Sequence, residues 1–560
     1  MIDFFAFFLI YFLFFLSSLG YGIFFFKTAN LNLNEQNIGF FGLFGIIFLT
    51  FLSYLSIFIT SHNSLFNLFI HFIGLAFFLL NYKKINFKFL DLFFFIILFT
   101  ALIISKNNED FPYYHFQQAL NFSQNKFQLG LANLEISFAH HSSLLYLNSL
   151  FYIPYYKYFF FNVPNLIIYT SLSIIFFNNS LDENNKLFLR FFSLFSLVFF
   201  LIKFDRLSEY GTDIMGQYTI ILFSFYILKV LTHQNKIFSK KNDLVILISL
   251  LCFCVTLKTY FIVYISLFFL IFLKINFKDF YFFIRDNLYF NFYIFLFCVL
   301  FLISNLLTTG CLIFPLPYLC FENLLWAIPI DEVNNLKIWY EVWSKSLAGA
   351  GYRIDNYEEL IHNFQWLKFW INNYFFTKVT DNLLAFIFLT CVMLILFRSK
   401  FSNKFIFELK NIKIFYFISF LLFIFWFTKH PTLRYGGYSI ILILFSIPTA
   451  VYLSKSSKFS FNLNNRIKFF TFFCLFVFFT TNINRIYSEF NRVDKYKFTN
   501  FPFFSVPQNI KYKSKKLNDL VNVYTPINEN CWDIPTPCPG GGEDLRATKK
   551  FGFILFYRDK

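Results

Sequence analysis

Charged side chains are scarce in this chain. Asp, Glu, Lys and Arg together make up 14% of its 560 residues, whereas hydrophobic residues make up 58% and the mean hydropathy is +0.57. A typical soluble domain carries about 25% charged residues. The composition therefore excludes an ordinary soluble globular domain.

The apolar residues occur in long runs, and 98 of these residues are phenylalanine. A run of roughly 20 apolar residues crosses a hydrocarbon core as a helix. We expect an all-α polytopic membrane protein with about 13–14 transmembrane helices. The expected spans are 4–26, 39–60, 65–80, 89–105, 160–177, 187–203, 218–231, 244–257, 260–274, 289–306, 383–397, 412–428, 436–453 and 467–480.

The formal net charge of +17 is distributed unevenly between the two sets of loops. One alternating set carries nineteen cations, namely Lys27, Lys83, Lys84, Lys88, Lys186, Lys236, Lys240, Lys241, Lys274, Lys278, Arg285, Arg398, Lys400, Lys404, Lys410, Lys455, Lys458, Arg466 and Lys468. The short loops of the opposite set carry six, Lys106, Lys126, Arg206, Lys258, Lys429 and Arg434. The positive-inside rule places the first set in the cytoplasm. The charge thus predicts membrane orientation, and we expect no nucleic-acid partner.

Cysteine usage agrees with this orientation. Five cysteines fall inside expected spans, and the other four form two close pairs on the expected outer side, Cys311 with Cys320 and Cys531 with Cys538. Such pairs suit disulfides in an oxidising periplasm, although four free thiols are the alternative. CxxC spacing and clustered histidines are absent, so we predict no zinc site.

We expect one membrane domain over residues 1–480, with outer loops at 106–142, 204–217 and 307–380, followed by a soluble periplasmic tail over 481–560. The sequence has no repeat of fixed period and no low-complexity linker. Lys27 follows the first apolar run instead of preceding it, which favours a retained first helix over a cleaved signal peptide. The tail has strand-like runs at Leu520–Tyr524 and Phe551–Tyr557, which predict a small α/β or β region.

The first outer loop places Glu109 and Asp110 directly beyond an expected span, before Pro112 and the aromatic cluster Tyr113-Tyr114-His115. A carboxylate at the edge of hydrocarbon is partly desolvated, which makes it a stronger base when ionised. The alternative is an ordinary solvated helix end. His140 and His141 follow this loop, but adjacent residues of a helix point about 100° apart and are poorly placed to bind one metal.

The remaining outer segments add acids, cations and aromatic rings. Asp213 lies next to the following apolar run, whereas we expect Asp205 to pair with Arg206, which is the simpler explanation of that couple. Lys258 and Arg434 are suited to phosphate binding, although each also fits a cation that snorkels from a helix end. The third segment holds five of the seven tryptophans, which suit membrane-interface anchoring or stacking on sugar rings.

The arrangement resembles the type C glycosyltransferases, which are integral membrane enzymes that use polyprenyl-phosphate-linked sugars. The resemblance rests on the acidic segment Glu109–His115, the short helix expected after His141, the segment ending at Asp213 and the Arg434-Tyr435 pair. The chain is also similar to a group of uncharacterised bacterial multi-spanning proteins. The features shared with that group are Tyr114-His115, Gly130–Asn133 (Gly-Leu-Ala-Asn) and the Cys-Trp…Pro-Cys tail.

The resemblance implies transfer of a sugar from a polyprenyl-phosphate donor to a cell-surface glycan or lipid acceptor, at the periplasmic face of a bacterial inner membrane. It implies Asp110 as general base, Arg434 and Lys258 at the donor phosphate, and His115 and Asp213 orienting the acceptor or a bound cation. The other implied site residues are Glu109, Tyr113, Tyr114 and Tyr435. The need for a divalent cation stays open, and membrane lipids are the surrounding partner. The competing classes are a transporter or flippase of lipid-linked saccharides, a polymerase, and a non-catalytic membrane protein.

Overall fold

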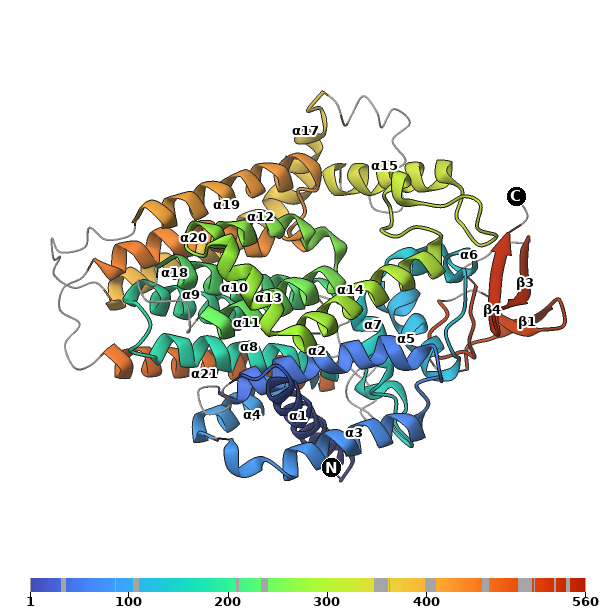
Figure 1. Ribbon diagram of the computed structural model, residues 1–560, viewed down its shortest axis with the longest axis horizontal. Coiled ribbons are helices and arrows are strands. Elements are labelled where there is room, and N and C mark those ends of the chain that lie inside the picture. Colours follow the sequence, from blue (N-terminus) through green and yellow to red (C-terminus); the bar gives the residue numbers. More distant parts are fainter. Residues whose placement is uncertain are drawn as a thin grey trace.

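The computed structural model of the protein describes residues 2–31, 37–85, 87–103, 110–207, 211–232, 240–346, 361, 363–397, 409–455, 463–491, 506–507, 509–527, 530–539 and 544–558. Most of these residues form a bundle of helices, and two β-hairpins lie at one end of it (Figure 1). The expectation of a mostly helical chain with a small strand-containing C-terminal region is therefore confirmed.

Nine helical runs within the described ranges are long and apolar enough to cross a membrane, which suggests a multi-pass membrane protein. They are α1 (Ile2–Thr28), α2 (Ile38–Ile57), α8 (Val163–Leu181), α10 (Asp213–Thr232), α14 (Leu288–Thr309), the continuous run of α17 (Trp366–Trp370), η10 (Ile371–Val379) and α18 (Thr380–Phe397), α19 (Leu409–Lys429), α20 (Gly437–Ser454) and α21 (Leu463–Asn491). A tenth span is possible at a bent pair of helical segments. The first segment consists of η7 (Thr259–Tyr264), α12 (Ile265–Phe268) and η8 (Phe269–Leu273), and the second is α13 (Phe277–Asp286), with an angle of 109° between them.

The expected count of 13–14 is too high for the part of the chain that the structure describes. Four expected spans are helices that do not belong to this set of nine, namely α3 (Ser64–Leu79), α4 (Phe89–Ile103), α9 (Leu187–Lys203) and α11 (Lys240–Leu257). In α9, 14 of 17 residues are buried against neighbouring helices. Its hydrophobicity therefore reflects the core of the bundle as much as contact with lipid.

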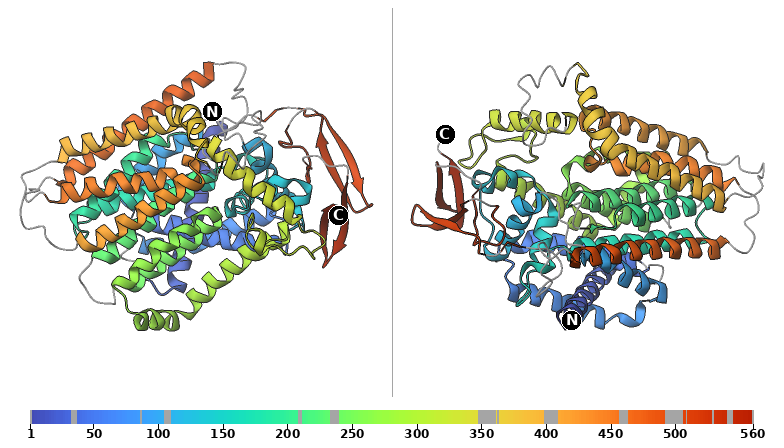
Figure 2. Two further views of the ribbon diagram at one scale, coloured as in Figure 1. Left: turned by 90° about the horizontal axis from the view of Figure 1, so that it is seen from above. Right: turned by 180° about the vertical axis from the view of Figure 1, so that it is seen from behind.

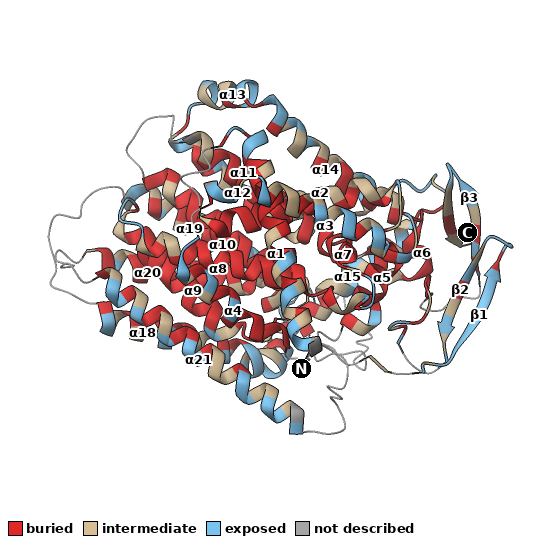
Figure 3. Cartoon of the chain, turned by 90° about the horizontal axis from the view of Figure 1, so that it is seen from below, coloured by how far each residue is buried: buried red, intermediate tan, exposed pale blue. Residues whose placement is uncertain are grey.

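The core of the bundle lies where α8, α9 and α10 pack together, and it forms the buried centre of Figure 3. The first three helices approach one another even more closely through glycine. A Cβ on Gly45 of α2 would lie 1.7 Å from the Ser18 carbonyl oxygen of α1, and a Cβ on Gly20 would lie 1.8 Å from the Gly74 oxygen of α3. Small residues at such crossings are a general means of packing membrane helices.

The two ends of the bundle differ in the elements found there. The end of α8, the start of α9, the end of α20 and the start of α21 lie at one end, where Lys186 precedes α9 and Lys455 follows α20. At the opposite end lies a layer that we call the cap, formed by residues 110–162, 310–346 and 506–558 as far as they are described. The three views of the molecule in Figures 1 and 2 agree on this separation.

The cap is built from short elements that return to the end of the bundle. Its helices are η2 (Phe111–His115), α5 (Phe116–Gln124), α6 (Leu131–Leu134), η3 (Ile136–Ala139), α7 (Ser143–Ser149), η4 (Tyr158–Phe160), η9 (Pro317–Leu319) and α15 (Ile330–Ser346). Strand β1 (Tyr512–Leu517) pairs antiparallel with β2 (Val521–Pro526), and β3 (Leu545–Lys550) pairs antiparallel with β4 (Phe553–Arg558). Disulfides join Cys311 to Cys320 and Cys531 to Cys538 within the cap.

The C-terminal hairpin is attached to the cap by backbone hydrogen bonds. The Leu129 N–H donates to the Ile554 oxygen at 2.9 Å, and the Phe556 N–H donates to the Leu129 oxygen at 2.9 Å. The Gln117 side chain also donates to the Ile534 oxygen at 3.4 Å. The tail is therefore fixed onto the segment that follows Asp110.

The charge asymmetry predicts that the cap faces away from the cytoplasm. In a chain with Cys391 replaced by Ser, we expect a membrane-impermeant maleimide to label Lys549→Cys of the cap in intact spheroplasts. Lys455→Cys at the other end should be labelled only after the membrane is permeabilised. Labelling of Lys455→Cys alone in intact spheroplasts would reverse the assigned orientation.

Candidate functional site

Four charged side chains from distant parts of the sequence meet where the bundle joins the cap. Asp110 precedes η2, Asp213 begins α10, Lys258 follows α11, and Arg434 lies in η11 (Leu433–Tyr435). Arg434 donates from Nη2 to Asp110 Oδ2 at 2.8 Å and from Nε to Asp213 Oδ2 at 2.9 Å. Lys258 forms an ion pair with the other oxygen of Asp213. We call these four residues the charge cluster.

The backbone around Arg434 is held by α10. Gln217 lies one turn after Asp213, and its amide nitrogen donates to the carbonyl oxygens of Leu433 at 3.0 Å and Arg434 at 3.2 Å. The Gln217 oxygen accepts the Ser439 N–H at 3.1 Å, which satisfies one of the unpaired donors at the start of α20. One side chain therefore fixes both the Arg434 turn and the helix that follows it.

The turn also requires glycine at its end. Gly436 has φ +93°, a left-handed conformation that side chains rarely adopt. Aromatic side chains hold the preceding residues: Trp370 Nε1 donates to the Pro431 oxygen at 2.7 Å, and Trp426 Nε1 donates to the Thr432 oxygen at 2.9 Å. The Tyr374 hydroxyl accepts the Leu433 N–H at 2.9 Å. Arg434 is thus presented by a rigid turn.

The charge cluster contains equal numbers of acids and cations and is partly shielded from solvent. The Asp213 side chain is 8% exposed and the Arg434 side chain 33%. Burial opposes ionisation of Asp110, but the charge and hydrogen bond of Arg434 outweigh it and hold the pKa of Asp110 below its usual value. Burial likewise opposes the charge of Arg434, yet Asp213 and Asp110 hold the pKa of Arg434 well above its usual value.

Lys258 differs from Arg434 in its electrostatics. Burial lowers the pKa of Lys258, and the Asp213 carboxylate offsets only part of that effect. The Lys258 ammonium lies 4.2 Å from the centre of the Tyr435 ring, a cation–π distance. Lys258 is therefore the cation of the cluster that gives up its proton more readily.

Aromatic rings surround the charge cluster on its cap side. The Arg434 guanidinium lies 5.6 Å from the Trp343 ring of α15 and 5.9 Å from the Tyr435 ring. His430 lies 5.3 Å from Tyr435, and its Nδ1 is 3.1 Å from the Ser344 hydroxyl, also on α15. Helix α15 thus contributes both a ring and a hydrogen bond beside the cluster.

The histidines near Asp110 are neutral at pH 7. Burial lowers the pKa of His115 to about 4, although the charges of Asp110 and Asp213 oppose the shift. Burial also lowers the pKa of His140 to about 4. The Tyr114 ring lies 4.3 Å from His115 and 5.9 Å from His140, so these three rings pack beside Asp110.

The structure brings together most of the residues that the sequence singled out, but not all of them. Asp110, Asp213, Lys258, Arg434 and Tyr435 are in direct contact, and His115 and Tyr114 lie beside them. Tyr113 lies at the rim, where its hydroxyl donates to Glu135 at 3.2 Å. Glu109 lies outside the described residues, and the four disulfide cysteines belong to cap loops.

Sequence reasoning assigned no site role to Gln217, Tyr374 or Trp343. For Trp343 the available signal was the concentration of tryptophan in the third outer segment. For Gln217 it was an amide close to the outer end of an apolar span. Neither signal indicates which way the side chain points.

The donor set does not suit a divalent cation. Arg434 and Lys258 already occupy both carboxylate oxygens of Asp213, and Arg434 also occupies one oxygen of Asp110. Among the described residues no group of three or more His, Cys, Asp or Glu is placed to hold a metal ion. We derive no chemical step through a metal here.

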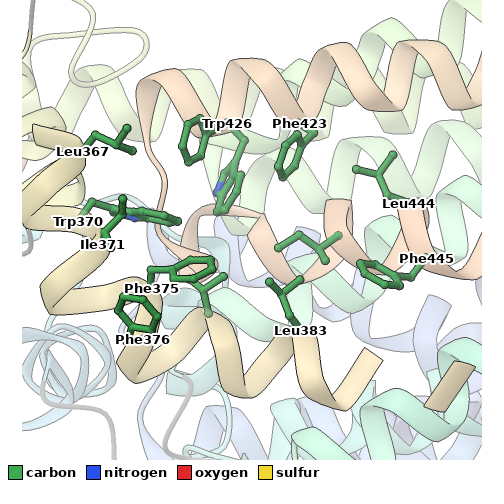
Figure 4. Close-up of a pocket in the computed structure, with 13 residues that line it drawn as sticks. Leu367, Trp370, Ile371, Phe375, Phe376, Leu383, Phe423, Trp426, Leu444 and Phe445 are labelled. Atoms are coloured by element: carbon green, nitrogen blue, oxygen red, sulfur yellow. The ribbon is translucent and has the colours of Figure 1, made fainter. Parts of the chain in front are cut away.

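An apolar groove begins beneath the Arg434 turn. Its volume is about 520 Å³, and it is lined by Leu367, Trp370, Ile371, Phe375, Phe376, Val379, Leu383, Phe423, Trp426, Phe427, Ile441, Leu444 and Phe445. Figure 4 shows these side chains between the run from α17 to α18 on one side and α19 and α20 on the other. Trp370 and Trp426, which bond the Arg434 turn, also line the groove. The groove and the charge cluster therefore share their supporting side chains.

Removal of Arg434 should destabilise the fold because it leaves two carboxylates without their common cation. We expect Arg434→Gln to lower the free energy of unfolding by about 2 kcal/mol, less than a fully buried pair because Arg434 is one-third exposed. Asp110→Asn in the same chain should restore part of the loss, as measured by thermal unfolding in detergent. The difference in unfolding free energy between the wild-type protein and Arg434→Gln should become smaller as the pH falls through the lowered pKa of Asp110. The reason is that this ion pair stabilises the fold only while the carboxylate is charged.

The matched control is Arg485→Gln, which breaks the ion pair of Arg485 with Asp205 at 2.7 Å; the sequence suggested Arg206 as the partner of Asp205. Asp110→Asn should not rescue this control. If it rescues neither variant, the coupling of Asp110 and Asp213 through Arg434 is wrong.

Comparison with known proteins gives a family but no activity. No curated protein and no solved structure matches the chain. The family described as a domain of unknown function, DUF8201, matches residues 4–442, which include the whole charge cluster and end within α20. Because this match covers more than half of the sequence, the chain belongs to the DUF8201 family.

Proposed function

We propose that the protein is a membrane glycosyltransferase that resembles the type C enzymes and uses a polyprenyl-phosphate-linked sugar. The observation that carries the proposal is the junction between the charge cluster and the apolar groove at the Arg434 turn. A lipid-linked phosphate has these same two parts, an anionic headgroup on a long apolar chain.

The cations of the charge cluster supply the phosphate contacts in this proposal. A guanidinium binds phosphate oxygens through paired hydrogen bonds, and an ammonium neutralises them as a point charge. Arg434 and Lys258 are both anchored by Asp213, so their side chains are already positioned before the substrate arrives. Such preorganisation lowers the cost of stabilising the charge that develops on the departing phosphate.

Asp110 acts as the general base in this mechanism. An acceptor hydroxyl oxygen attacks the anomeric carbon, the bond from that carbon to the phosphate oxygen breaks with its electron pair going to phosphate, and the hydroxyl proton passes to Asp110. Before the donor binds, Arg434 holds Asp110 as a weak base with a lowered pKa. A phosphate that binds Arg434 competes for its guanidinium and releases Asp110, which raises the basicity of the carboxylate.

The surrounding rings suit the sugar. Trp343 and Tyr435 lie within 6 Å of the Arg434 guanidinium, next to the position that the phosphate would take. Flat aromatic faces pack against the apolar faces of sugar rings, and the polar edges of such rings stay free for hydrogen bonds. The neutral His115 and the Tyr114 ring then border the side of Asp110 from which an acceptor approaches.

The groove accommodates the lipid chain. All thirteen lining residues are apolar or aromatic. The indole nitrogens of Trp370 and Trp426 already donate hydrogen bonds to backbone oxygens just before Arg434. We place the reaction at the outer face of a bacterial inner membrane because the basic loops lie at the opposite end of the bundle. The acceptor is then a cell-surface glycan or lipid.

Asp110→Asn should abolish transfer while the protein still inserts in the membrane, because the amide cannot accept the proton. We expect the lipid-linked sugar to accumulate as it does in a deletion strain, and the surface glycan to fall by about a hundredfold or more. Asp331→Asn on the exposed face of α15 is the control and should leave glycan synthesis unchanged. Wild-type glycan in the Asp110→Asn strain would remove Asp110 from the mechanism, and intermediates trapped on the cytoplasmic leaflet would indicate flipping instead.

A second prediction concerns binding of the lipid chain in the groove. Phe376 lines it and is 65% exposed, whereas Phe388 lies further along the same helical run, is 64% exposed and does not line it. A benzoylphenylalanine at position 376 should capture radiolabelled polyprenyl phosphate on irradiation at least about fivefold more than one at position 388, because a bound chain has a fixed place. Equal capture at both positions would indicate random contact with membrane lipid.

A further inference from the structure

The tail carries cations on one strand of each of its two hairpins. Strand β1 reads Tyr-Lys-Ser-Lys-Lys-Leu and β3 reads Leu-Arg-Ala-Thr-Lys-Lys, so six of their twelve residues are cations and none is an acid. Their partners β2 and β4 contain a single cation, Arg558. We call β1 and β3 the basic strands.

The two basic strands are joined to each other. Asn518, in the turn after β1, donates from its side chain to the Ala547 oxygen of β3 at 2.7 Å. The Lys511, Lys513 and Lys515 side chains share one face of β1 and its extension, because side chains alternate along a strand. Neighbours on that face are roughly 6.8 Å apart. The basic strands therefore present a spaced row of cations.

These cations are exposed, and three of them pair with no acid among the described residues. All six Lys and Arg residues of the two strands are exposed, as is Lys511. Lys516 pairs with Asp519 at 3.0 Å. Lys511, Lys513 and Lys515 make no ion pair with any acid that the structure describes. Like-charged neighbours repel one another, so a row of this kind is favourable mainly when an anion binds to it.

Membrane orientation does not explain the row. The positive-inside bias accounts for cations at the other end of the bundle, whereas the hairpins lie at the end of the cap farthest from those loops (Figures 1 and 2). Figure 3 shows the same hairpins projecting from the cap with exposed strands. These cations therefore lie at the end of the molecule opposite to the basic loops.

An exposed aromatic ring accompanies the cations of β3. Phe551 follows Lys550 and is 78% exposed, whereas Tyr512 is 44% exposed and lies on the face of β1 opposite to Lys511 and Lys513. The Lys550 ammonium lies 5.5 Å from the centre of the Phe551 ring. Cations beside exposed rings fit a polymer that has both negative charges and sugar rings.

We propose that the basic strands bind an acidic glycan, a linear polysaccharide that carries carboxylate or phosphate groups. The binding surface is distinct from the charge cluster and does not depend on the proposed transfer reaction. The loop that contains Trp532 connects the two regions: the Tyr524 N–H of β2 donates to the Pro537 oxygen of this loop at 3.0 Å, and the Trp532 ring lies 6.4 Å from Phe111, the residue after Asp110. A glycan on the tail is thereby held by the same unit that packs against the candidate site.

The test uses the full-length protein in nanodiscs of neutral phosphatidylcholine. We expect fluorescent polygalacturonate, a carboxylated polysaccharide, to bind with an affinity that falls at high salt, as measured by fluorescence anisotropy. Lys513→Glu/Lys515→Glu should weaken binding at least about tenfold, because two attractive contacts become repulsive. The control Lys337→Glu/Lys368→Glu makes the same charge change at exposed residues outside the tail and should change the affinity less than about twofold.

Three outcomes would overturn the proposal. The first is that neither polygalacturonate nor polyphosphate binds the wild-type protein. The second is equal weakening by both double variants, which would show that overall charge determines binding. The third is that Lys513 and Lys515 are required only for binding to phosphatidylglycerol vesicles, which would make a lipid surface the partner. Proteolysis of both variants checks that the disulfide-bonded tail stays folded.

Discussion

The bridge that Arg434 makes between Asp110 and Asp213 is the interaction on which the candidate site depends. Charges at the edge of a hydrocarbon layer are expensive to desolvate, and they persist only when each one is paired and held in good geometry. Here the cost is met by four chain segments that arrive at one point, with Lys258 completing the neutral cluster. Removal of any one member leaves an excess charge, so the arrangement constrains the ends of α10, α11 and α19 together.

The Arg434 turn joins the charge cluster to the apolar groove. Trp370 and Trp426 bond the backbone of the turn with their indole nitrogens and line the apolar groove with their rings. Polar and apolar binding surfaces therefore meet at one structural element, without a flexible linker between them. The same logic extends outward, where α15 places Trp343 against the guanidinium and the tail packs on the segment that follows Asp110. The proposed substrate, with a charged head and an apolar chain, rests on this layering.

The sequence predicts which segments form helices and strands better than it predicts how those segments contact one another. Apolar runs identify the helices, but they overestimate the number of spans because a core helix such as α9 is as hydrophobic as one that faces lipid. Strand-like runs predict β2 and β4, whereas β1 and β3 are rich in lysine, which is depleted in strands. Charge and helix-end position were enough to single out Asp110 and Arg434. The ion pairs between them, and the role of Gln217, depend on contacts between segments far apart in sequence, which local patterns do not encode.

The central claim is that a phosphate on a polyprenyl chain binds where the charge cluster meets the groove. Native mass spectrometry of the purified protein with polyprenyl phosphate and with the uncharged polyprenol tests it most directly. The account predicts a retained adduct with the phosphate, little with the alcohol, and loss of the adduct in Arg434→Gln when that variant remains folded. Equal retention of phosphate and alcohol, or an adduct that is indifferent to Arg434, would contradict it.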